Sequence, residues 1–597
     1  MKELLKLNHL FYRYKGTLAL GSLFLVLSNL FLIWIPVLIR QTMDRIEQIA
    51  GQRHLTFERA GEVLFSAEAG TLLALNTAYL VGAALLYGVL LFGTRQTIIV
   101  ASRKIEYDLR NKIYNHLQKL PRSFFDRNKS GDIYTRATED VVRVREYFGP
   151  AFMYTVNTIS RTTLIVAIMF MVNARLTAWA LLPLPFLAVM AYWVSRYINR
   201  RSAEIQQQYA LMAGKLQETY GSIRLVKAYN RQEYEKERFF RESARYRRKK
   251  LRLDVVEALF HPMLLFLIGI SVVLVVWQGG VMVMEGAVTV GNIAEFVIYV
   301  NYLTWPVASL GYTLNLLQRS AASNSRIQKL LAVPPETGAE PDTSPPRFEK
   351  ELVFENVTFT YPGAAQPALK NISMRIRPGE RVGVVGRTGS GKTTLVQLIP
   401  RLYDPQEGCI RIDGKDIRDY NLSQLRAMIG FVPQDNFLFS DTIGENIGFG
   451  KEDATEEEII KVAEKAEVLE NILDFEKKFD TILGERGITL SGGQKQRTSI
   501  ARALIRKPSV LILDDSLSAV DTRTEDAIIR HLDRDLGNYS MFLICHRLSS
   551  LKHVDTIYVL DDAGIVEHGT HGELLERNGF YANMYRKQQL EEELEHI

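Results

Sequence analysis

The sequence predicts two unlike halves: an all-α domain of six membrane helices with long helical extensions, fused to an α/β domain with a largely parallel sheet. Three observations carry this prediction. Long uncharged segments lie before residue 320, a proline-rich stretch follows them, and apolar strands separated by helical segments come after it. We therefore expect a membrane domain at 1–331, a linker at 332–348 and a second domain at 349–597.

The overall composition excludes few functions. A net charge of +6 and an isoelectric point near 8.9 are too mild to indicate nucleic-acid binding, and a basic surface facing a membrane would account for them equally well. The two cysteines, Cys409 and Cys545, supply neither a disulfide framework nor a Cys-based zinc site. The mean hydropathy of -0.03 is an average over two unlike halves.

Six segments have the length of about 20 apolar residues that a helix needs to cross a bilayer. Five of them contain no Asp, Glu, Lys or Arg, and the remaining one is interrupted only by Arg161. The six predicted spans are 17–39, 71–94, 148–174, 176–195, 258–284 and 296–318. The alternative is a set of buried core helices in a water-soluble protein, but so many lengths of this kind would rarely occur together by chance.

Basic residues are distributed unevenly over the connections between these spans. Eleven Lys and Arg lie in 103–145 and sixteen in 196–252, whereas 40–59 holds four and 285–295 holds none. Since basic loops remain on the cytoplasmic side, both of these loops and both chain termini are predicted to be cytoplasmic. We see no cleavable signal peptide and expect the first span to stay in the membrane.

The two basic loops are predicted to be helical stalks. In the first, apolar residues recur at helical spacing, at Ile105, Leu109, Ile113, Leu117 and Leu120. Turns are predicted near Pro121–Asp132 and Glu218–Gln232, and they carry aromatic residues that we expect to be exposed, namely Phe124, Phe125, Tyr220 and Tyr229. Such stalks suit the transmission of motion; solvated scaffolding is the alternative, and it would not explain the aromatic residues.

Two charged residues near the spans need separate interpretation. Arg161 falls inside the third span, where it can line a pathway, extend its charge towards the interface or form a structural pair. The last two readings are favoured. Glu295 lies where the sixth span begins, and we expect the positive N-terminal end of that helix to stabilise it.

The second half opens with a phosphate-binding motif. "GRTGSGKTT", Gly386–Thr394, matches G-x-x-x-x-G-K-[ST] and lies between an apolar strand and a helix-like run. Three glycines permit tight turns, so the N–H groups of the loop can point at phosphate oxygens. Lys392 is predicted to reach the β- and γ-phosphates of ATP, and the Thr393 hydroxyl to ligate Mg²⁺. The expected nucleotide-binding residues here are Gly386, Arg387, Thr388, Gly389, Ser390, Gly391, Lys392, Thr393 and Thr394.

A second strand, Val510–Leu513, ends in two adjacent aspartates. Asp514 is predicted to hold Mg²⁺ directly or through water, as the Walker B acid of the site. Further apolar strands at Val382–Val385, Met541–Ile544 and Ile557–Leu560 are separated by helical segments, which indicates a largely parallel sheet. The nucleotide is expected at the carboxyl ends of these strands.

The most specific motif is "ITLSGGQKQR", Ile488–Arg497. Ser491 is placed to cap a helix that begins at Gly492, and Gly492 and Gly493 leave the first N–H groups of that helix bare. Together with Gln494 these residues form a second anion-binding device. One nucleotide does not need both devices from the same chain. We therefore predict two domains arranged head to tail, each presenting this motif to the ATP on the other's loop.

In this order and spacing, the motifs resemble those of an ATP-binding cassette (ABC) exporter half-transporter, of the multidrug or lipid type, over essentially the whole length. The resemblance implies an α/β P-loop NTPase domain with a helical subdomain, in a prokaryotic plasma membrane. It also implies that Tyr361 stacks on adenine, that Gln434 approaches Mg²⁺, and that His546 contacts the γ-phosphate. "GERG", Gly484–Gly487, would touch the membrane-domain turns, and Asp521 would contact the opposing subunit.

Asp515 departs from the family pattern, which has glutamate at this position to polarise the attacking water. Aspartate is one methylene shorter, and a small misplacement of a base can lower a rate on the order of 100-fold. The resemblance therefore implies a chain that binds ATP but hydrolyses it slowly in its own site, and a heterodimer with a glutamate-containing half-transporter. A homodimer in which Asp515 acts through a shifted water is the alternative.

The implied activity is that of an ATPase coupled to export of a hydrophobic or amphipathic drug, lipid or peptide. A non-transporting ATP-regulated membrane sensor or channel is the alternative function. The expected partners are the second half-transporter, membrane lipids and the substrate, with no nucleic acid.

Overall fold

The computed structural model describes residues 8–52, 67–338, 340, 348–484, 487, 490–534, 539–545 and 547–595. His546, and Glu485 and Arg486 of the "GERG" segment, lie outside the described residues. The chain forms two compact units. The first comprises Met1–Gln118 with Gly131–Val333, and the second comprises Lys119–Ser130 with Pro334–Ile597.

Within the described part of the first unit, six helical stretches are long and apolar enough to cross a membrane. Each overlaps one of the predicted spans, so the prediction of six membrane helices is confirmed. The stretches are Phe11–Gln48, Leu73–Leu117, Ser130–Val172, Ala174–Gly221, Gln232–Met284 and Val290–Leu331.

Several of these stretches are built from more than one helix. A π-helical turn, Arg95–Ile99, joins α4 to α5, and another, Tyr147–Ala151, joins α8 to α9. The helices of the first unit are α2 (Asn8–Gln52), α4 (Ala67–Thr94), α5 (Val100–Leu117), α7 (Ser130–Ala137), α8 (Glu139–Glu146), α9 (Phe152–Val172), α10 (Ala174–Leu181), α11 (Leu184–Gly221), α12 (Ile223–Ala228), α13 (Gln232–Met284) and α14 (Val290–Leu331).

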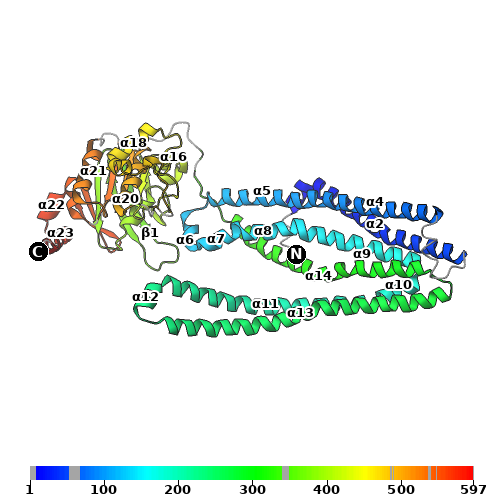
Figure 1. The fold of residues 1–597 in the computed structure, drawn as a ribbon. Coiled ribbons are helices and arrows are strands. Elements are labelled where there is room, and N and C mark those ends of the chain that lie inside the picture. The colour runs from blue at the N-terminus through cyan, green and yellow to red at the C-terminus, as the bar shows by residue number, and fades with distance from the viewer. Residues whose placement is uncertain are drawn as a thin grey trace. The chain divides into compact units, whose positions relative to one another are not determined.

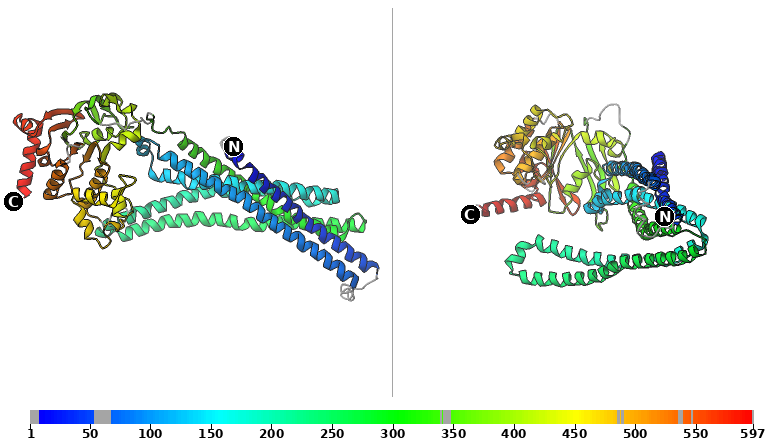
Figure 2. Two further views of the ribbon diagram at one scale, coloured as in Figure 1. Left: turned by 90° about the horizontal axis from the view of Figure 1, so that it is seen from above. Right: turned by 45° about the vertical axis from the view of Figure 1, so that its right-hand side comes forward.

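The predicted stalks are present as continuations of membrane helices. Figures 1 and 2 show α11 and α13 side by side along most of their length, with the short helix α12 at their joined end. With 53 residues, α13 is about 80 Å long at ~1.5 Å per residue, far more than a bilayer needs. Tyr220 and Tyr229 flank α12 and are exposed, as predicted.

The predicted apolar stripe of the first stalk is buried. Ile105 and Ile113 on α5 are fully buried, Leu109 and Leu120 are nearly so, and Leu117 is half-buried. Another core, in the spans, gathers apolar side chains from α2, α9, α10, α11, α13 and α14, including Ile33, Met169 and Phe296. These residues recur on one side of each helix, which is why the helices assemble into a bundle.

Glu295 has a different partner from the one predicted. The N-terminus of α14 is capped by Thr289 in a capping box with Asn292, whereas Glu295 lies a turn further along and is fully buried. Its carboxylate accepts hydrogen bonds from Arg40 and Tyr299, each at 3.0 Å. The prediction that the helix terminus stabilises Glu295 is therefore wrong, because the guanidinium of Arg40 on α2 supplies the compensating charge.

The second unit contains two sheets. One is antiparallel, in the order β2-β1-β4-β5, and the other is mixed, in the order β10-β9-β3-β8-β7-β6. The strands are β1 (Leu352–Phe359), β2 (Leu369–Ile376), β3 (Arg381–Gly386), β4 (Glu407–Ile412), β5 (Lys415–Asp416), β6 (Ile429–Val432), β7 (Val510–Asp514), β8 (Ser540–Ile544), β9 (Thr556–Asp561) and β10 (Gly564–Gly569).

The larger sheet confirms the predicted parallel arrangement. Strands β9, β3, β8, β7 and β6 are parallel neighbours, and only β10 runs antiparallel to its neighbour β9. Every residue of β7 and β8 is buried, as expected of strands covered on both faces. The carboxyl ends of β3, β6, β7 and β8 therefore meet at one edge of the sheet.

Helices pack around these sheets and complete two apolar cores. They are α6 (Arg122–Arg127), α15 (Lys392–Leu398), α16 (Leu422–Ala427), α17 (Ile443–Gly448), α18 (Glu456–Lys465), α19 (Leu469–Leu473), α20 (Gly492–Leu504), α21 (Thr522–Arg534), α22 (His571–Glu576) and α23 (Phe580–Glu595). Helix α6 comes from the first stalk turn yet belongs to this unit. For this reason the prediction that Phe124 is exposed is wrong: its side chain is 8% exposed, whereas that of Phe125 is 38% exposed.

Candidate functional site

The loop between β3 and α15 carries the predicted phosphate-binding residues, Gly386–Thr394. Gly386 is the last residue of β3, and α15 begins at Lys392. At Gly391 φ is +99°, and a Cβ atom there would lie 2.4 Å from the carbonyl oxygen of Ala368. Only glycine accepts this backbone conformation and this close approach without strain. The motif therefore forms the tight strand-to-helix turn that phosphate binding requires.

Lys392 lies in the centre of this loop. Its Nζ donates hydrogen bonds to the carbonyl oxygens of Gly386 at 2.8 Å and of Arg387 at 2.9 Å. Burial lowers the pKa of its ammonium group, and the carboxylates of Asp514 and Asp515 oppose that effect. The loop thus holds a buried cation at the edge of the sheet where β7, separated from β3 by β8, ends in Asp514.

Asp514 ends β7 with a nearly fully buried side chain. One of its carboxyl oxygens accepts a hydrogen bond from the Thr393 hydroxyl at 3.1 Å. The other oxygen is buried and has no hydrogen-bond partner among the described residues. Burial raises the pKa of this carboxyl to about 6, although the hydrogen bond from Thr393 opposes the shift.

These atoms fit a magnesium ion. Mg²⁺ takes oxygen ligands and is usually held by one or two carboxylates together with substrate phosphates. The unpartnered oxygen of Asp514 and the adjacent Thr393 hydroxyl supply two such groups. No group of three His, Cys, Asp or Glu residues in the described part of the chain could hold a metal ion. Phosphate oxygens would therefore have to supply further ligands.

Gln434 and Asp515 lie at the same edge of the sheet. Gln434 follows β6, whose last residue, Val432, pairs with Leu513 of β7, and its side chain is exposed. Asp515 has a left-handed backbone with φ of +47°, and its N–H donates to the carbonyl oxygen of Ile544 at 3.0 Å. The structure thus brings Asp514, Asp515, Lys392, Thr393 and Gln434 to one edge.

Tyr361 is held beside the first turn of α15. Its hydroxyl lies 3.1 Å from the Thr394 hydroxyl and donates to Gln397 at 3.3 Å. Its ring packs edge-on against the rings of Phe359 and Tyr403, with centroids 5.0 and 5.4 Å away. These contacts fix an aromatic ring next to the phosphate loop, where a nucleotide base can stack on it.

The second anion-binding motif forms the predicted capped helix. The Ser491 side chain accepts from the N–H of Gln494, and the Gln494 side chain accepts from the N–H of Ser491, which is a capping box at the start of α20. A Cβ atom at Gly493 would lie 2.8 Å from the carbonyl oxygen of Ala519, so the helix start packs closely on the segment after Asp515.

Gln496 ties the capped helix to that segment, and sequence reasoning did not identify this residue. Its side chain donates to the Ser518 hydroxyl at 3.2 Å and accepts from the N–H of Ala519 at 3.0 Å. Asp521 then accepts from the N–H of Thr524 at 3.0 Å, and this hydrogen bond lowers the pKa of its carboxyl. The motif Ile488–Arg497, called the signature motif below, is therefore connected to the segment "SLSAVD", Ser516–Asp521.

The two anion-binding devices remain separate within one chain. Among the described residues, no hydrogen bond or ion pair links Ser491, Gly492, Gly493 or Gln494 to Gly386–Thr394, and Ser491 is exposed. On the other side of the phosphate loop, the guanidinium of Arg387 lies 5.1 Å from the ring of Phe580 on α23. Arg387 is therefore engaged by the C-terminal helix.

Tyr403 connects α6 to the nucleotide site, and the sequence offered no signal for it. Its hydroxyl donates to the Asp126 carboxylate at 2.6 Å, and its ring contacts those of Phe359 and Tyr361. Burial, together with this hydrogen bond, raises the pKa of Tyr403 to about 12. A chain of contacts thus runs from the ring of Tyr361 through Tyr403 to α6.

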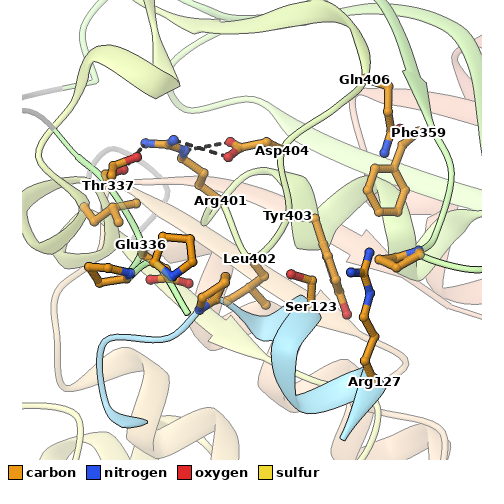
Figure 3. Close-up of a pocket in the computed structure, with 15 residues that line it drawn as sticks. Ser123, Arg127, Glu336, Thr337, Phe359, Arg401, Leu402, Tyr403, Asp404 and Gln406 are labelled. Carbon is orange, nitrogen blue, oxygen red and sulfur yellow. Dashed lines mark hydrogen bonds and ion pairs between the residues drawn. The ribbon is translucent and has the colours of Figure 1, made fainter. Parts of the chain in front are cut away.

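A hollow of about 350 Å³ lies beside this connection, between α6, the linker and the loop that follows α15. Figure 3 shows Ser123 and Arg127 of α6 beside Tyr403, with Glu336 and Thr337 of the linker nearby. Hydrogen-bonded contacts fix the linker. Arg426 pairs with Glu336 at 2.8 Å, and Arg401 donates to the carbonyl oxygen of Thr337 at 3.0 Å.

Two family models match the chain. One, described as "ABC transporter transmembrane region", matches residues 18–307, and the other, described as "ABC transporter", matches residues 369–518. The chain is also 36% identical over 489 residues to the "Probable multidrug resistance ABC transporter ATP-binding/permease protein YheI" of Bacillus subtilis (strain 168), which covers 81% of this chain and 83% of that protein.

Another relative and a solved structure extend the comparison. The chain is 34% identical to the "ATP-dependent lipid A-core flippase" of Desulfotalea psychrophila (strain LSv54 / DSM 12343), over 81% of this chain and 84% of that protein. The "Structure of a bacterial Atm1-family ABC exporter with ATP bound" superposes with a TM-score of 0.76 at 25% identity. That similarity covers 97% of this chain and 99% of the other.

Proposed function

Because the chain belongs to the ABC transporter family, as an exporter half-transporter with fused membrane and nucleotide-binding domains, we propose that it is one subunit of a heterodimer with unequal nucleotide sites. It is a multi-pass integral membrane protein whose ABC domain binds ATP and couples ATPase activity to export of drugs or lipids. Exporters of this kind dimerise. What the proposal adds is the division of catalytic labour between two different chains.

The observation that carries the proposal is Asp515, directly after the end of β7. The position directly after the buried Asp514 is where a base for the attacking water is needed, and this chain places a short carboxylate there. Helix α20 of the signature motif, in contrast, has its full capping box at Ser491 and Gln494. The carboxylate that follows Asp514 is short, whereas the signature motif is intact. This combination favours a partner that carries glutamate at the position equivalent to Asp515 and uses this chain's signature motif.

Two kinds of composite site follow from this division. In one, this chain's phosphate loop and Asp515 face the partner's signature motif and mainly hold ATP. In the other, Ser491, Gly492, Gly493 and Gln494 face the partner's phosphate loop, where hydrolysis is fast. In the first site, Thr393, Asp514 and Gln434 would hold Mg²⁺, which when bound neutralises charge on the phosphates. Lys392 orients the β- and γ-phosphates, and His546 is proposed to contact the latter.

Transport follows from closure of the two nucleotide-binding domains. ATP links a loop on one subunit to a helix N-terminus on the other, so binding draws the domains together. Helix α6 and the helices of the second stalk then move, and the membrane cavity opens on the opposite side. We propose that the stalks and both termini are cytoplasmic, in a prokaryotic plasma membrane, since the basic residues are concentrated in those loops.

Purification from the native source tests the proposal most simply. We expect a second half-transporter with a Walker B glutamate to co-purify, and the pair to show Mg²⁺-dependent ATPase activity and nucleotide-driven substrate movement in vesicles. The pair with Lys392→Ala should keep hydrolysis at the partner's site but lose ATP from this chain's site. Robust turnover by this chain alone, abolished in Asp515→Asn, would instead establish the homodimer.

A further inference from the structure

Arg161 lies at the middle of the membrane domain. It is 12 residues from Asn173, where α9 ends, which places it about 18 Å from that end at ~1.5 Å per residue. Tyr302 on α14 is 12 residues from Val290, where α14 begins, and therefore lies at about the same depth. In a hydrocarbon layer about 30 Å thick, this is too deep for the guanidinium to reach the interface.

The side chain of Arg161 points into the bundle. Asn157, Arg161, Ile165 and Met169 are spaced by four residues on α9 and so share one face of that helix. Ile165 and Met169 on that face are fully buried, whereas Ile159 is 62% exposed. The stripe faces α2, because the Asn157 side chain accepts a hydrogen bond from Asn29 on α2 at 3.1 Å.

Amide and hydroxyl groups surround the guanidinium. The Nε of Arg161 donates to Asn29 Oδ1 at 3.2 Å, and Asn29 Nδ2 donates to the Ser160 hydroxyl at 2.8 Å. A polar cluster drawn from α2 and α9 therefore lies at mid-depth in the bundle.

The guanidinium has hydrogen-bonding capacity left over. It carries five N–H donors, and Nε satisfies one of them through Asn29. In the described part of the chain, its terminal nitrogens have no hydrogen-bond acceptor, and they are not fully buried. The two-pronged end of the side chain is thus free to receive a planar or tetrahedral anion, as guanidinium groups do in bidentate pairs.

No carboxylate among the described residues forms an ion pair with Arg161. The six predicted spans contain no Asp or Glu. Glu295, seven residues before Tyr302, is already bound to Arg40 and Tyr299. Arg161 forms no ion pair with any described residue, so the structural pair that the sequence favoured is not found there. A second copy of this chain would bring the same spans and would likewise supply no acid at this depth.

We propose that Arg161 binds the anionic group of the transported substrate, which is therefore an amphipathic anion with a carboxylate, sulfonate or phosphate headgroup. The inference rests on the proposed export function and specifies its substrate class. The apolar chain of the substrate packs against the surrounding side chains. A charged residue inside a membrane bundle is costly and commonly marks a substrate pathway, and the anion compensates that charge during transport.

The test compares two probes that differ only in charge. The complete transporter, produced with its partner subunit, is reconstituted in phosphatidylcholine nanodiscs, and ATPase stimulation is titrated with 11-(dansylamino)undecanoic acid and with its methyl ester. We expect the acid to act at a concentration at least tenfold lower than the ester. In Arg161→Gln the acid should become no better than the ester, and Arg161→Lys should retain part of the preference.

The matched control is Arg175→Gln, which removes an exposed arginine that pairs with Glu285 at 3.5 Å. It should leave the acid-to-ester preference unchanged. An unaltered preference in Arg161→Gln overturns the inference, and so does an equal loss of response to both probes, which would indicate a structural role or a carboxylate of the partner subunit. Loss of the wild-type preference when phosphatidylglycerol is added would identify a bilayer lipid as the occupant instead.

Failure of the inference can be told apart from failure of the proposed function. If the complete transporter hydrolyses ATP but responds to neither probe, or to both equally, the anionic substrate class is refuted while the ATPase function stands. If it hydrolyses no ATP and moves no substrate under any condition, the proposed function itself is refuted.

Discussion

Asp514 and Asp515 show how two neighbouring residues of the same type receive different tasks. Asp514 belongs to β7, so its side chain is fixed in the sheet next to Thr393, and its free oxygen is buried. Asp515 adopts a left-handed backbone and is only half-buried. Aspartate tolerates this conformation better than most residues with a Cβ atom. The backbone turn therefore sets where the second carboxylate can reach, and one methylene decides how far.

Asp515→Glu is expected to raise hydrolysis at this chain's own site. The longer side chain restores reach to the attacking water, and the gain is on the order of 100-fold if misplacement alone limits the rate. Because glutamate tolerates the left-handed backbone less well than aspartate, the substitution should lower the free energy of unfolding by about 1 kcal/mol. ATPase activity is measured in the heterodimer after the partner's Walker B glutamate is changed to glutamine, so that only this site can contribute.

The control for this substitution is Asp561→Glu, which makes the same change at the end of β9. Its ATPase rate should equal that of the heterodimer in which only the partner's glutamate has been changed to glutamine. High turnover by the unmodified site in this assay would contradict a slow Asp515, as would an Asp515→Glu variant no faster than that heterodimer.

Among the elements, α6 has a contact of particular functional interest. It comes from the first stalk turn but forms part of the second unit, where Phe124 is buried and Asp126 accepts a hydrogen bond from Tyr403. Tyr403 also contacts the ring of Tyr361, whose hydroxyl lies beside Thr394 at the phosphate loop. Tyr361 is therefore connected to α6 through the ring and hydroxyl of Tyr403.

Tyr403→Phe is expected to uncouple hydrolysis from transport. It deletes the hydrogen bond to Asp126 but keeps the ring packing, and one hydrogen bond to a charged group contributes roughly 1.5 kcal/mol or less at an exposed position. Transport per ATP hydrolysed should fall roughly threefold to tenfold, since ~1.4 kcal/mol corresponds to a factor of ten. Substrate movement and phosphate release are measured on the same vesicles.

Asp126→Asn should reproduce this effect, whereas Tyr114→Phe, at an exposed tyrosine on α5, should have none. The pKa of Tyr403 is raised from 10.0 to about 12, so the stabilising protonated hydroxyl is fully present below pH 10 and is lost as the pH rises through 12. Titration of this hydroxyl should therefore not alter coupling between pH 6 and 9. Unchanged transport per ATP in Tyr403→Phe would remove this contact from the coupling route.

The elements that could be predicted from sequence are those with a local signal. Periodicity and length located the six spans, and the Ser491 cap was predicted from the residues of its own first turn. Contacts between distant residues could not be predicted in this way. Arg40 and Glu295 are 255 positions apart, and Asp126 and Tyr403 are 277 apart, so neither pair produces a pattern in a single sequence. The burial of Phe124 was missed for the same reason.

At the scale of the whole molecule, the chain is incomplete as a catalyst. It carries a phosphate loop, with the residues proposed to hold Mg²⁺, and the capped helix α20, but no hydrogen bond or ion pair joins them among the described residues. The exposed Ser491 and Asp521 are available to a second subunit. In the proposed heterodimer, two chains facing each other complete two sites, and the different fates of their ATP would follow from Asp515.

The most direct test of this account is the distance between the two nucleotide-binding domains, measured by double electron–electron resonance on the complete transporter. One spin label is placed at Lys461→Cys, on the exposed side of α18, in a Cys409→Ser background, and the other at the matching position of the partner. We predict a single inter-label distance, shorter than without nucleotide, when Mg·ATP is bound and hydrolysis is blocked. The shortening should be smaller in Lys392→Ala, which weakens ATP binding to this chain. A distance distribution that stays the same with and without Mg·ATP would contradict the account.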